Sequence, residues 1–255
     1  MGRGIGPENG RMGLCRALDI LLPRRCLLCR EASAAGLCTG CDADLPATGS
    51  ACDRCGIPLD YPWSGSTCVH LDARLCGACI RKPPPFDRTV AALEYVFPVT
   101  VLVQRFKFNR SFACGAVLAN RLLRALEADL ARPCDRPASI IPVPLHPARQ
   151  FLRAFNQAEV LARDLGNALG IPVSSRALRR RRRTPAQSGL SAAARKKNLK
   201  GAFTARPKAA SDLSGQHVAL VDDVMTTGAT VGECARVLKQ AGVQSVAVWV
   251  VARAL

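Results

Sequence analysis

The chain has 255 residues and a formal net charge of +17, from 36 Lys and Arg against 19 Asp and Glu. Hydrophobic residues make up 49% of it, which excludes a disordered tail and allows one large or two unequal domains with a sizeable core. No run approaches 18 apolar residues, and the apolar stretch at 17–22 carries an acid and lacks a cleavage pattern. We therefore expect neither a membrane span nor a secretory signal.

Charge and cysteine content divide the chain into two parts. Residues 1–86 hold 10 basic and 8 acidic residues, whereas residues 87–255 hold 26 and 11, and ten of the 13 cysteines lie before position 80. Three prolines at 83–85 separate these parts. Each fixes φ and lacks a backbone donor, so neither a helix nor a central strand crosses them. We expect a Cys-rich domain at 23–82 and a second domain at 87–255, with residues 1–22 unassigned.

Eight of the cysteines form four CxxC pairs in the first part. In such a pair one tight turn aims both thiolates at one ion, and two pairs complete a closed, structural Zn²⁺ site with no open position. The odd number of cysteines and the length of the chain favour reduced thiolates in the cytoplasm over disulfides. The eight candidate metal ligands are Cys26, Cys29, Cys38, Cys41, Cys52, Cys55, Cys76 and Cys79.

The spacing of the CxxC pairs leaves their pairing around the metal open. Sequential pairing and interleaved pairing, first with third and second with fourth, both satisfy the four-thiolate rule. Redox-active pairs and an iron–sulfur cluster are the alternatives to zinc. Cys68 and His70 offer further ligand atoms, but we expect both to be bystanders. The region has few large apolar residues, so bound metal would supply its folding energy. We expect loss of a ligand such as Cys52 to misfold this region and to leave ligand binding by residues 87–255 largely intact.

From residue 88 onward the sequence predicts an α/β domain. Apolar, strand-like segments alternate with segments of helical periodicity, and Gly170 and Gly242 end two of the helices. This alternation implies a parallel sheet covered on both faces, with its ligand at the carboxyl ends of the strands. The expected strands are 89–96, 139–143, 217–222 and 245–252, and the expected helices are 112–130, 157–169 and 229–241.

A strongly basic run lies in the middle of this domain. Residues 179–200 hold nine basic residues and no acid, including five consecutive arginines at 179–183. Such a run suits the phosphate backbone of a nucleic acid, as does the excess of basic residues in the whole domain. Aromatic residues are not interleaved with it, so base stacking is not indicated. The alternative is an ordinary solvated, charged surface.

The strand expected at 217–222 runs into two acids, a Thr/Gly loop and the start of a helix. Unpaired backbone N–H groups and hydroxyls at the loop and helix start form a phosphate cradle. The two carboxylates can accept hydrogen bonds from neighbouring sugar hydroxyls or help to hold Mg²⁺, and together these features describe a ribose 5-phosphate site. No Walker lysine pattern is present, and the alternative is an ordinary strand–cap–helix turn. The candidate residues are Asp222, Asp223, Val224, Met225, Thr226, Thr227, Gly228, Ala229 and Thr230.

This string resembles the motif of type I phosphoribosyltransferases that binds 5-phosphoribosyl 1-pyrophosphate (PRPP). Residues 106–108, 141–146, 153–158 and 183–203 resemble the ComF family, and the four CxxC pairs are similar to the double zinc ribbon at the front of that family. The resemblance covers the chain from about Cys26 to its end. One departure is Ala154, where the family usually has Gly.

The resemblance implies a type I phosphoribosyltransferase fold, a parallel sheet with flanking helices, that binds PRPP with Mg²⁺. Asp222 and Asp223 would hold the ribose hydroxyls as the catalytic acids, and residues 225–230 would hold the 5-phosphate. The region around the basic run would form a hood that excludes water from an oxocarbenium-like transition state and stabilises the leaving pyrophosphate. The residues expected to face the pyrophosphate are Val143, Pro144, Lys107 and Arg183.

The resemblance also links the chain to DNA uptake in natural competence, or to the use of imported DNA and nucleobases. It implies an enzyme that transfers a phosphoribosyl group to an unidentified acceptor, and competence-machinery proteins as partners. The alternative is a catalytically silent, DNA-associated adaptor that binds single-stranded DNA or competence proteins through the basic loop and zinc ribbons. Fold alone does not decide between these, because type I folds can lose catalysis and keep PRPP binding.

Overall fold

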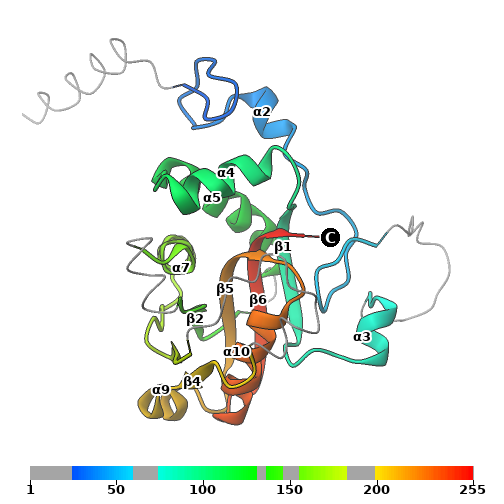
Figure 1. The fold of residues 1–255 in the computed structure, drawn as a ribbon, viewed down its shortest axis with the longest axis vertical. Coiled ribbons are helices and arrows are strands. Elements are labelled where there is room, and N and C mark those ends of the chain that lie inside the picture. Colours follow the sequence, from blue (N-terminus) through cyan, green and yellow to red (C-terminus); the bar gives the residue numbers. More distant parts are fainter. Residues whose placement is uncertain (1–24, 60–73, 131–135, 146–154, 183–198, 255) are drawn as a thin grey trace, which may run out of the picture. The chain divides into compact units, whose positions relative to one another are not determined.

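The computed structural model describes residues 25–59, 74–130, 136–145, 155–182 and 199–254 (Figure 1). The chain forms two compact units, Met1–Leu45 and Pro46–Leu255. This division falls between the second and third CxxC pairs. The second half of the Cys-rich region therefore belongs to the same compact unit as the α/β core. The domain limits expected from the sequence stay a prediction.

The described part of the first unit consists of a tight turn and a short helix that carry the first two CxxC pairs. The backbone N–H of Arg30 donates to the carbonyl of Cys26 at 3.1 Å and closes the first tight turn. Helix α2 (Thr39–Ala43) begins after Cys38, whose sulfur accepts the backbone N–H of Cys41. Among residues 25–45 only Cys26, Leu37 and Leu45 are buried, which is consistent with folding that depends on metal.

The second unit is built on a four-stranded sheet in the order β1-β6-β5-β2, in which every neighbouring pair is parallel. This confirms the predicted fold class. Six of the nine residues of β5 and eight of the nine residues of β6 are buried, since parallel sheets are covered on both faces. The strands are β1 (Arg88–Glu94), β2 (Ser139–Pro142), β5 (His217–Met225) and β6 (Ser245–Arg253).

Helices cover both faces of this sheet. Alternate strand residues such as Val218, Leu220 and Val248 share a core with the buried side of α10 (Ala229–Gln240). On the other side α5 (Phe112–Asp129) packs against β1 and β6, and α7 (Gln157–Leu169) packs against β2 and β5. The expected helices are confirmed to within a residue at their ends.

The remaining described elements lie outside the four-stranded sheet. Helix α4 (Val99–Phe108) packs on α5, and the antiparallel strands β3 (Leu178–Arg180) and β4 (Phe203–Ala205) pair outside the main sheet. Two further short helices are α3 (Gly77–Arg81) and α9 (Pro207–Asp212). Among the described residues, no helix combines the length and the apolar character needed to cross a membrane.

One strand is longer than expected. The sequence predicts that β5 ends at Asp222, but its pairing with β6 continues through Val224↔Ala252 to Met225↔Arg253. Both acids therefore lie within the strand, because the ladder with β6 satisfies backbone groups that the sequence pattern assigned to a loop.

Candidate functional site

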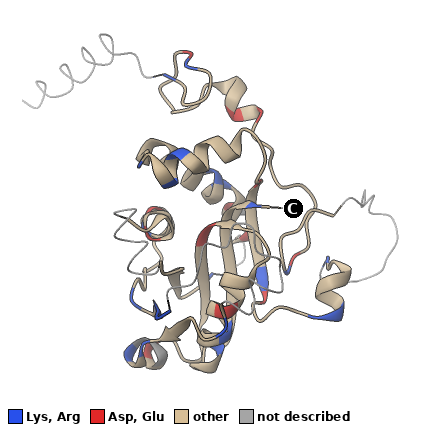
Figure 2. Cartoon of the chain, viewed as in Figure 1, with Lys and Arg blue, Asp and Glu red and all other residues tan. Residues whose placement is uncertain are grey.

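Asp222 and Asp223 are consecutive residues near the end of β5, and Figure 2 colours the acidic positions of the chain red and the basic positions blue. Consecutive strand residues point to opposite faces of a sheet. Asp223 is 7% exposed and meets the Nζ atom of Lys107 on α4 at 3.0 Å. Asp222 lies near Arg180 and Cys234. Both carboxylates accept the backbone N–H of the next residue, at 2.9 Å for Asp222 and 2.6 Å for Asp223, which turns them towards the carboxyl end of the strand.

The environment of Asp222 raises the pKa of its carboxyl from 3.8 to about 7. Burial is the largest cause, followed by repulsion from Asp223, while Lys107 and Arg180 oppose the rise. Repulsion between like charges and the loss of water both disfavour the ionised form. This carboxyl is therefore poised to change charge near neutral pH, and cations or hydrogen-bond donors on a ligand would favour its ionised form.

Lys107 is held in this place by aromatic packing. Its neighbour Phe106 is fully buried, and the ring of Phe106 lies 5.5 Å from that of Phe155, which in turn lies 5.2 Å from that of Phe112. Such tilted aromatic pairs are a favoured arrangement. Two stretches that are separate in the sequence, 106–108 and 155–157, therefore meet beside Asp223.

Asn156 explains how the loop after β2 is positioned. Its Oδ1 atom accepts the backbone N–H of Ala158 as the N-cap of α7, and its Nδ2 atom donates to the carbonyl of Val143 at 3.1 Å. The N–H of Val143 donates to the carbonyl of Val221 at 2.9 Å. Val143, expected to face pyrophosphate, is thus fixed beside Asp222 from two directions.

The Thr/Gly loop (residues 226–228) connects β5 to α10. Gly228 is the N-cap of α10 and has a φ of 71°, a left-handed conformation that favours glycine. The Oγ1 atom of Thr227 accepts the N–H of Ala229 at 3.4 Å. The helix that follows presents its first backbone N–H groups and the positive end of its dipole at this loop, which suits a phosphate.

A cavity of about 520 Å³ opens at the carboxyl end of β2 and borders Pro144. Five arginines and one glutamate are its charged lining residues, so its surface favours anions. Arg180 departs from the picture of a solvated basic run. It is 5% exposed, and its guanidinium lies 5.3 Å from the ring centroid of Phe203. The burial pattern of β3, in which Leu178 and Arg180 are buried and Arg179 is exposed, accounts for this difference.

The structure brings most of the site residues predicted from the sequence to one edge of the sheet. Asp222, Asp223 and Lys107 are in direct or near contact, and Val143 joins them from β2. Arg183 lies outside the described residues. Asn156 and Arg180 were missed as individual site residues. The N-cap position of Asn156, directly before a predicted helix, was the available signal.

The eight CxxC cysteines gather into two clusters by sequential pairing. The ligand atoms within each cluster lie within 4.8 Å of one another. Sγ atoms are 3.6 Å apart for Cys29 and Cys38 and 3.7 Å apart for Cys55 and Cys76. A tetrahedral zinc ion with Zn–S bonds of about 2.3 Å requires sulfur separations of about 3.8 Å, so both clusters fit zinc. Cys68 and His70 lie outside the described residues. The first cluster is Cys26, Cys29, Cys38 and Cys41, and the second cluster is Cys52, Cys55, Cys76 and Cys79.

Comparison with known families and proteins agrees with this architecture. The double zinc ribbon domain matches residues 17–80, and the phosphoribosyl transferase domain matches residues 154–255. Competence protein F of Haemophilus influenzae is 37% identical over 234 residues, covering 90% of this chain and 97% of that protein. DNA utilization protein YhgH of Escherichia coli K12 is 35% identical over 240 residues, covering 92% of this chain and 100% of that protein.

Among solved structures, orotate phosphoribosyltransferase from Aeropyrum pernix matches with a TM-score of 0.36 and 18% identity, covering 61% of this chain and 92% of that chain. Competence protein F and DNA utilization protein YhgH each align with this chain over almost their whole length. The chain belongs to the family of competence protein F and DNA utilization protein YhgH, the ComF family, in which a double zinc ribbon precedes a phosphoribosyltransferase domain.

Proposed function

We propose that this protein binds PRPP with Mg²⁺ at the carboxyl ends of β2 and β5 and transfers its phosphoribosyl group to an acceptor. The observation that carries the proposal is the convergence of two carboxylates, a lysine and a helix-capping Thr/Gly loop at one edge of the sheet. A sugar diol, a phosphate and a pyrophosphate each find the chemistry that they require within this group.

Each part of PRPP has a proposed partner. Asp222 and Asp223 accept hydrogen bonds from the ribose hydroxyls, and residues 225–230 donate backbone and hydroxyl hydrogen bonds to the 5-phosphate. Lys107, together with Arg183, Val143 and Pro144, faces the pyrophosphate. Bound Mg²⁺ would neutralise charge on the pyrophosphate as it leaves.

Lys107 has two roles in this proposal. In the free protein it forms an ion pair with Asp223 at 3.0 Å. A bound pyrophosphate would compete for the same ammonium group, while the ribose hydroxyls and Mg²⁺ take over the carboxylate. A buried ion pair that loses one partner is strongly destabilising. In this exchange Lys107 and Asp223 each gain a new partner, so neither charge is left unpaired.

The biological setting that we propose is the uptake or use of DNA. The names of the relatives, competence protein F and DNA utilization protein, support it. The basic cavity beside Pro144 supports an anionic acceptor or a nucleic-acid-derived substrate. Two thiolate clusters need a reducing compartment, so the cytoplasm is the proposed location.

Calorimetry of the full chain with PRPP and Mg²⁺, followed by a screen of nucleobases for pyrophosphate release, tests the proposal. Binding with micromolar affinity and release of pyrophosphate with one base class is the expected result. Binding without release from any base would favour the silent adaptor. Absence of PRPP binding would contradict the proposed site.

A further inference from the structure

Arg253, the last residue of β6, connects the second cluster to the Thr/Gly loop. The residue is buried, with 7% of its surface exposed. The Nε atom donates to the carbonyl of Cys55 at 3.0 Å, and the Nη1 atom donates to the carbonyls of Met225 at 3.2 Å and of Thr226. One side chain thus bridges a metal-ligand residue and the junction of β5 with the Thr/Gly loop.

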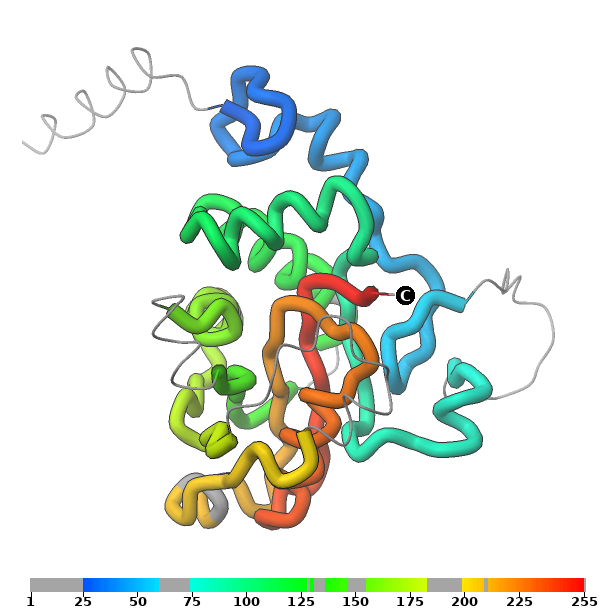
Figure 3. The backbone as a smooth tube through the Cα atoms, in the orientation of Figure 1, coloured from blue at the N-terminus to red at the C-terminus, as the bar shows by residue number. Residues whose placement is uncertain are grey.

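The backbone geometry brings these segments together. The N–H of Ala254 donates to the carbonyl of Met225 at 2.9 Å, so the end of the chain runs beside the link from β5 to α10 (Figure 3). Met225 and Arg253 are also register partners in the sheet. The Thr/Gly loop therefore begins where the Nη1 atom of Arg253 donates to the carbonyls of Met225 and Thr226.

The turn that carries Cys52 and Cys55 is itself attached to the sheet. The backbone N–H and the Oγ1 atom of Thr89 on β1 donate to the carbonyls of Asp53 at 2.9 Å and Arg54 at 2.7 Å. Thr89 also lies so close to Gly56 that a Cβ there would be 2.9 Å from its methyl group. A displacement of this turn cannot be absorbed without movement at β1 or at Arg253.

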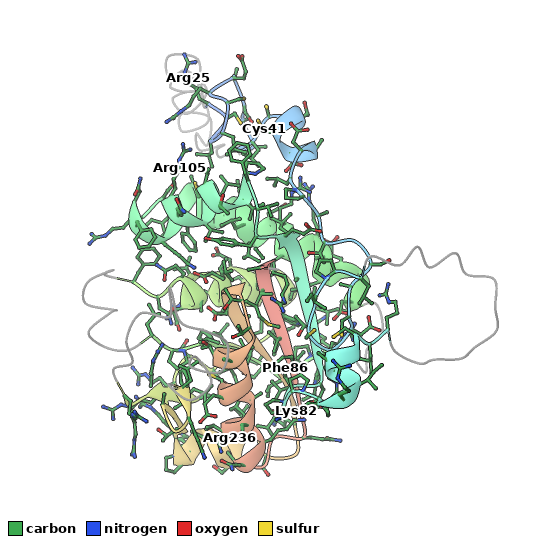
Figure 4. The ribbon with its side chains drawn as sticks, turned by 45° about the vertical axis from the view of Figure 1, so that its right-hand side comes forward. Arg25, Cys41, Lys82, Phe86, Arg105 and Arg236 are labelled. Carbon is green, nitrogen blue, oxygen red and sulfur yellow. The ribbon has the colours of Figure 1, made fainter. Side chains whose placement is uncertain are left out.

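A second contact reaches the loop from the same side. Phe86 is 1% exposed and lies beside α10 (Figure 4). A Cβ at Gly228 would be 3.6 Å from its ring. Phe86 lies a few residues after α3, the helix that contains Cys79. Each CxxC pair of the second cluster is therefore linked to a residue that contacts the loop. The Cys52/Cys55 pair is linked through the hydrogen bond to Arg253, and the Cys76/Cys79 pair precedes Phe86 in the chain.

The charge of the second cluster also helps to hold the guanidinium of Arg253 in position. Arg253 interacts electrostatically with Cys55, Cys76 and Cys79. Four thiolates around Zn²⁺ carry a net formal charge of about −2, so the guanidinium is a counter-charge to the cluster. Without metal, the Cys55 turn loses its constraint, and the carbonyl that orients Arg253 moves with it.

We propose that Arg253 is a positioning residue that couples metal binding by the second cluster to the conformation of the Thr/Gly loop. The part that concerns ligand affinity rests on the proposed binding of PRPP. The first cluster belongs to the other compact unit and provides the matched control.

Hydrogen exchange of the full-length protein tests the coupling without any ligand. In Cys76→Ser, amides in peptides covering 225–232 should exchange at least about fivefold faster, a typical lower value for a coupling between sites. Cys38→Ser, in the first cluster, should leave them unchanged. Equal exchange in the two variants would overturn the proposal.

Arg253→Lys decides the case if Cys76→Ser fails to fold. Lysine keeps the charge but donates from a single nitrogen, so it lacks the planar arrangement in which Arg253 reaches Cys55 from Nε and Thr226 from Nη1. The variant should retain its zinc and still show faster exchange at 225–232. If zinc is retained and exchange at these residues matches that of the wild type, Arg253 has no positioning role.

Coupling is reciprocal, so PRPP with Mg²⁺ should slow the release of zinc from the second cluster to a chelating dye. Arg253→Lys should lose this protection, whereas a merely structural residue would lower thermal stability and leave the protection in place. Retained protection in Arg253→Lys would overturn the proposal. If the wild type binds no PRPP in calorimetry, the proposed function fails, and the exchange comparison still decides the coupling.

Discussion

At the scale of single residues, the acid pair at the end of β5 is the part of the site with the most direct chemistry. Asp223 is paired with Lys107, whereas Asp222 is held in a setting that disfavours its charge. The two acids thus have separate environments although they are adjacent in the chain. Their expected contributions can be measured separately.

Replacing both acids tests the proposed ribose contacts. Asp222→Asn with Asp223→Asn removes two anionic acceptors, and hydrogen bonds to charged groups are worth about 1.5–3 kcal/mol each. PRPP affinity in calorimetry should fall at least about tenfold. Asp164→Asn, an exposed acid on α7, is the control and should bind PRPP as the wild type does. Unchanged affinity in the double variant would refute the ribose contacts.

The raised pKa of Asp222 predicts a pH dependence with a definite sign. With a pKa of about 7, the carboxylate fraction rises about tenfold between pH 6 and pH 8, so PRPP affinity should rise with it. PRPP itself titrates in this range, and Asp222→Asn reports that background. A pH dependence identical in the variant and the wild type would exclude Asp222 as its source.

The same carboxyl should affect stability in the opposite sense. Its folded-state pKa lies above the ordinary value of 3.8, so the folded state binds the proton more tightly. Its contribution to the free energy of unfolding is fully present below about pH 4 and is lost as pH rises through about 7. The melting temperature of ligand-free Asp222→Asn should therefore be higher than that of the wild type at pH 8, and the two melting temperatures should be closer at pH 5.

At the scale of elements, short connections between helices and strands decide the shape of the site. The N-cap of α7 is also the anchor of the loop after β2, through the two hydrogen bonds of Asn156. The last turn of α4 supplies Lys107. The residues at these element ends thus stabilise the fold and also position groups that would face a ligand. Substitutions can separate the two effects.

Asn156→Ser and Asn156→Ala separate these parts. Serine keeps an N-cap acceptor for Ala158 but is too short to reach the carbonyl of Val143. Asn156→Ser should melt close to the wild type and bind PRPP more weakly, whereas Asn156→Ala should also lose about 1 kcal/mol of stability. Melting curves and calorimetry give both values. Wild-type affinity in both variants would show that the Val143 link does not position the ligand.

The basic run at 179–182 should be tested through its exposed members. Arg179, Arg181 and Arg182 are exposed, whereas Arg180 is buried against Phe203. Replacing the three exposed arginines by Ser should flatten the log–log salt dependence of single-stranded DNA binding by up to about two units, at about 0.7 per phosphate contact. Sequence preference should stay the same, because phosphate contacts carry no base information. An unchanged slope would return these side chains to the solvated-surface interpretation.

At the scale of the whole molecule, the two Cys clusters belong to different compact units. The sequence predicts that the Cys-rich region can lose a ligand without effect on the α/β domain. The hydrogen bonds from Thr89 and Arg253 argue against this for the second cluster. The two clusters should therefore differ in what their metal stabilises.

Metal analysis and melting test this difference. Purified protein should contain about two zinc ions per chain by the four-thiolate rule. Cys76→Ser should lower the melting temperature of the main transition, by about 2–4 °C for each kcal/mol lost, and Cys38→Ser should leave that transition in place. An iron-rich, coloured preparation would contradict zinc, and equal melting of the two variants would contradict the assignment of the clusters to different units.

The sequence by itself determined the fold class and the positions of the main elements. The reason is physical: apolar runs, helical periodicity and the glycine that ends a helix are local signals, and α7 and α10 begin where these signals place them. The string from Val218 to Thr230 indicated a phosphate and sugar site for the same reason, because its whole chemistry is contiguous. The CxxC spacing likewise indicated metal, since two residues between thiolates suffice to aim both at one ion.

Only the tertiary structure decided which distant groups meet. Sequential pairing of the CxxC motifs, the Lys107–Asp223 ion pair and the bridge from Arg253 to Cys55 join residues that are far apart in the chain or equally spaced in two arrangements. The burial of Arg180 within a basic run depends on which side of β3 packs against Phe203. Such contacts arise from packing and from the register of a parallel sheet, and the local pattern of a sequence does not encode them.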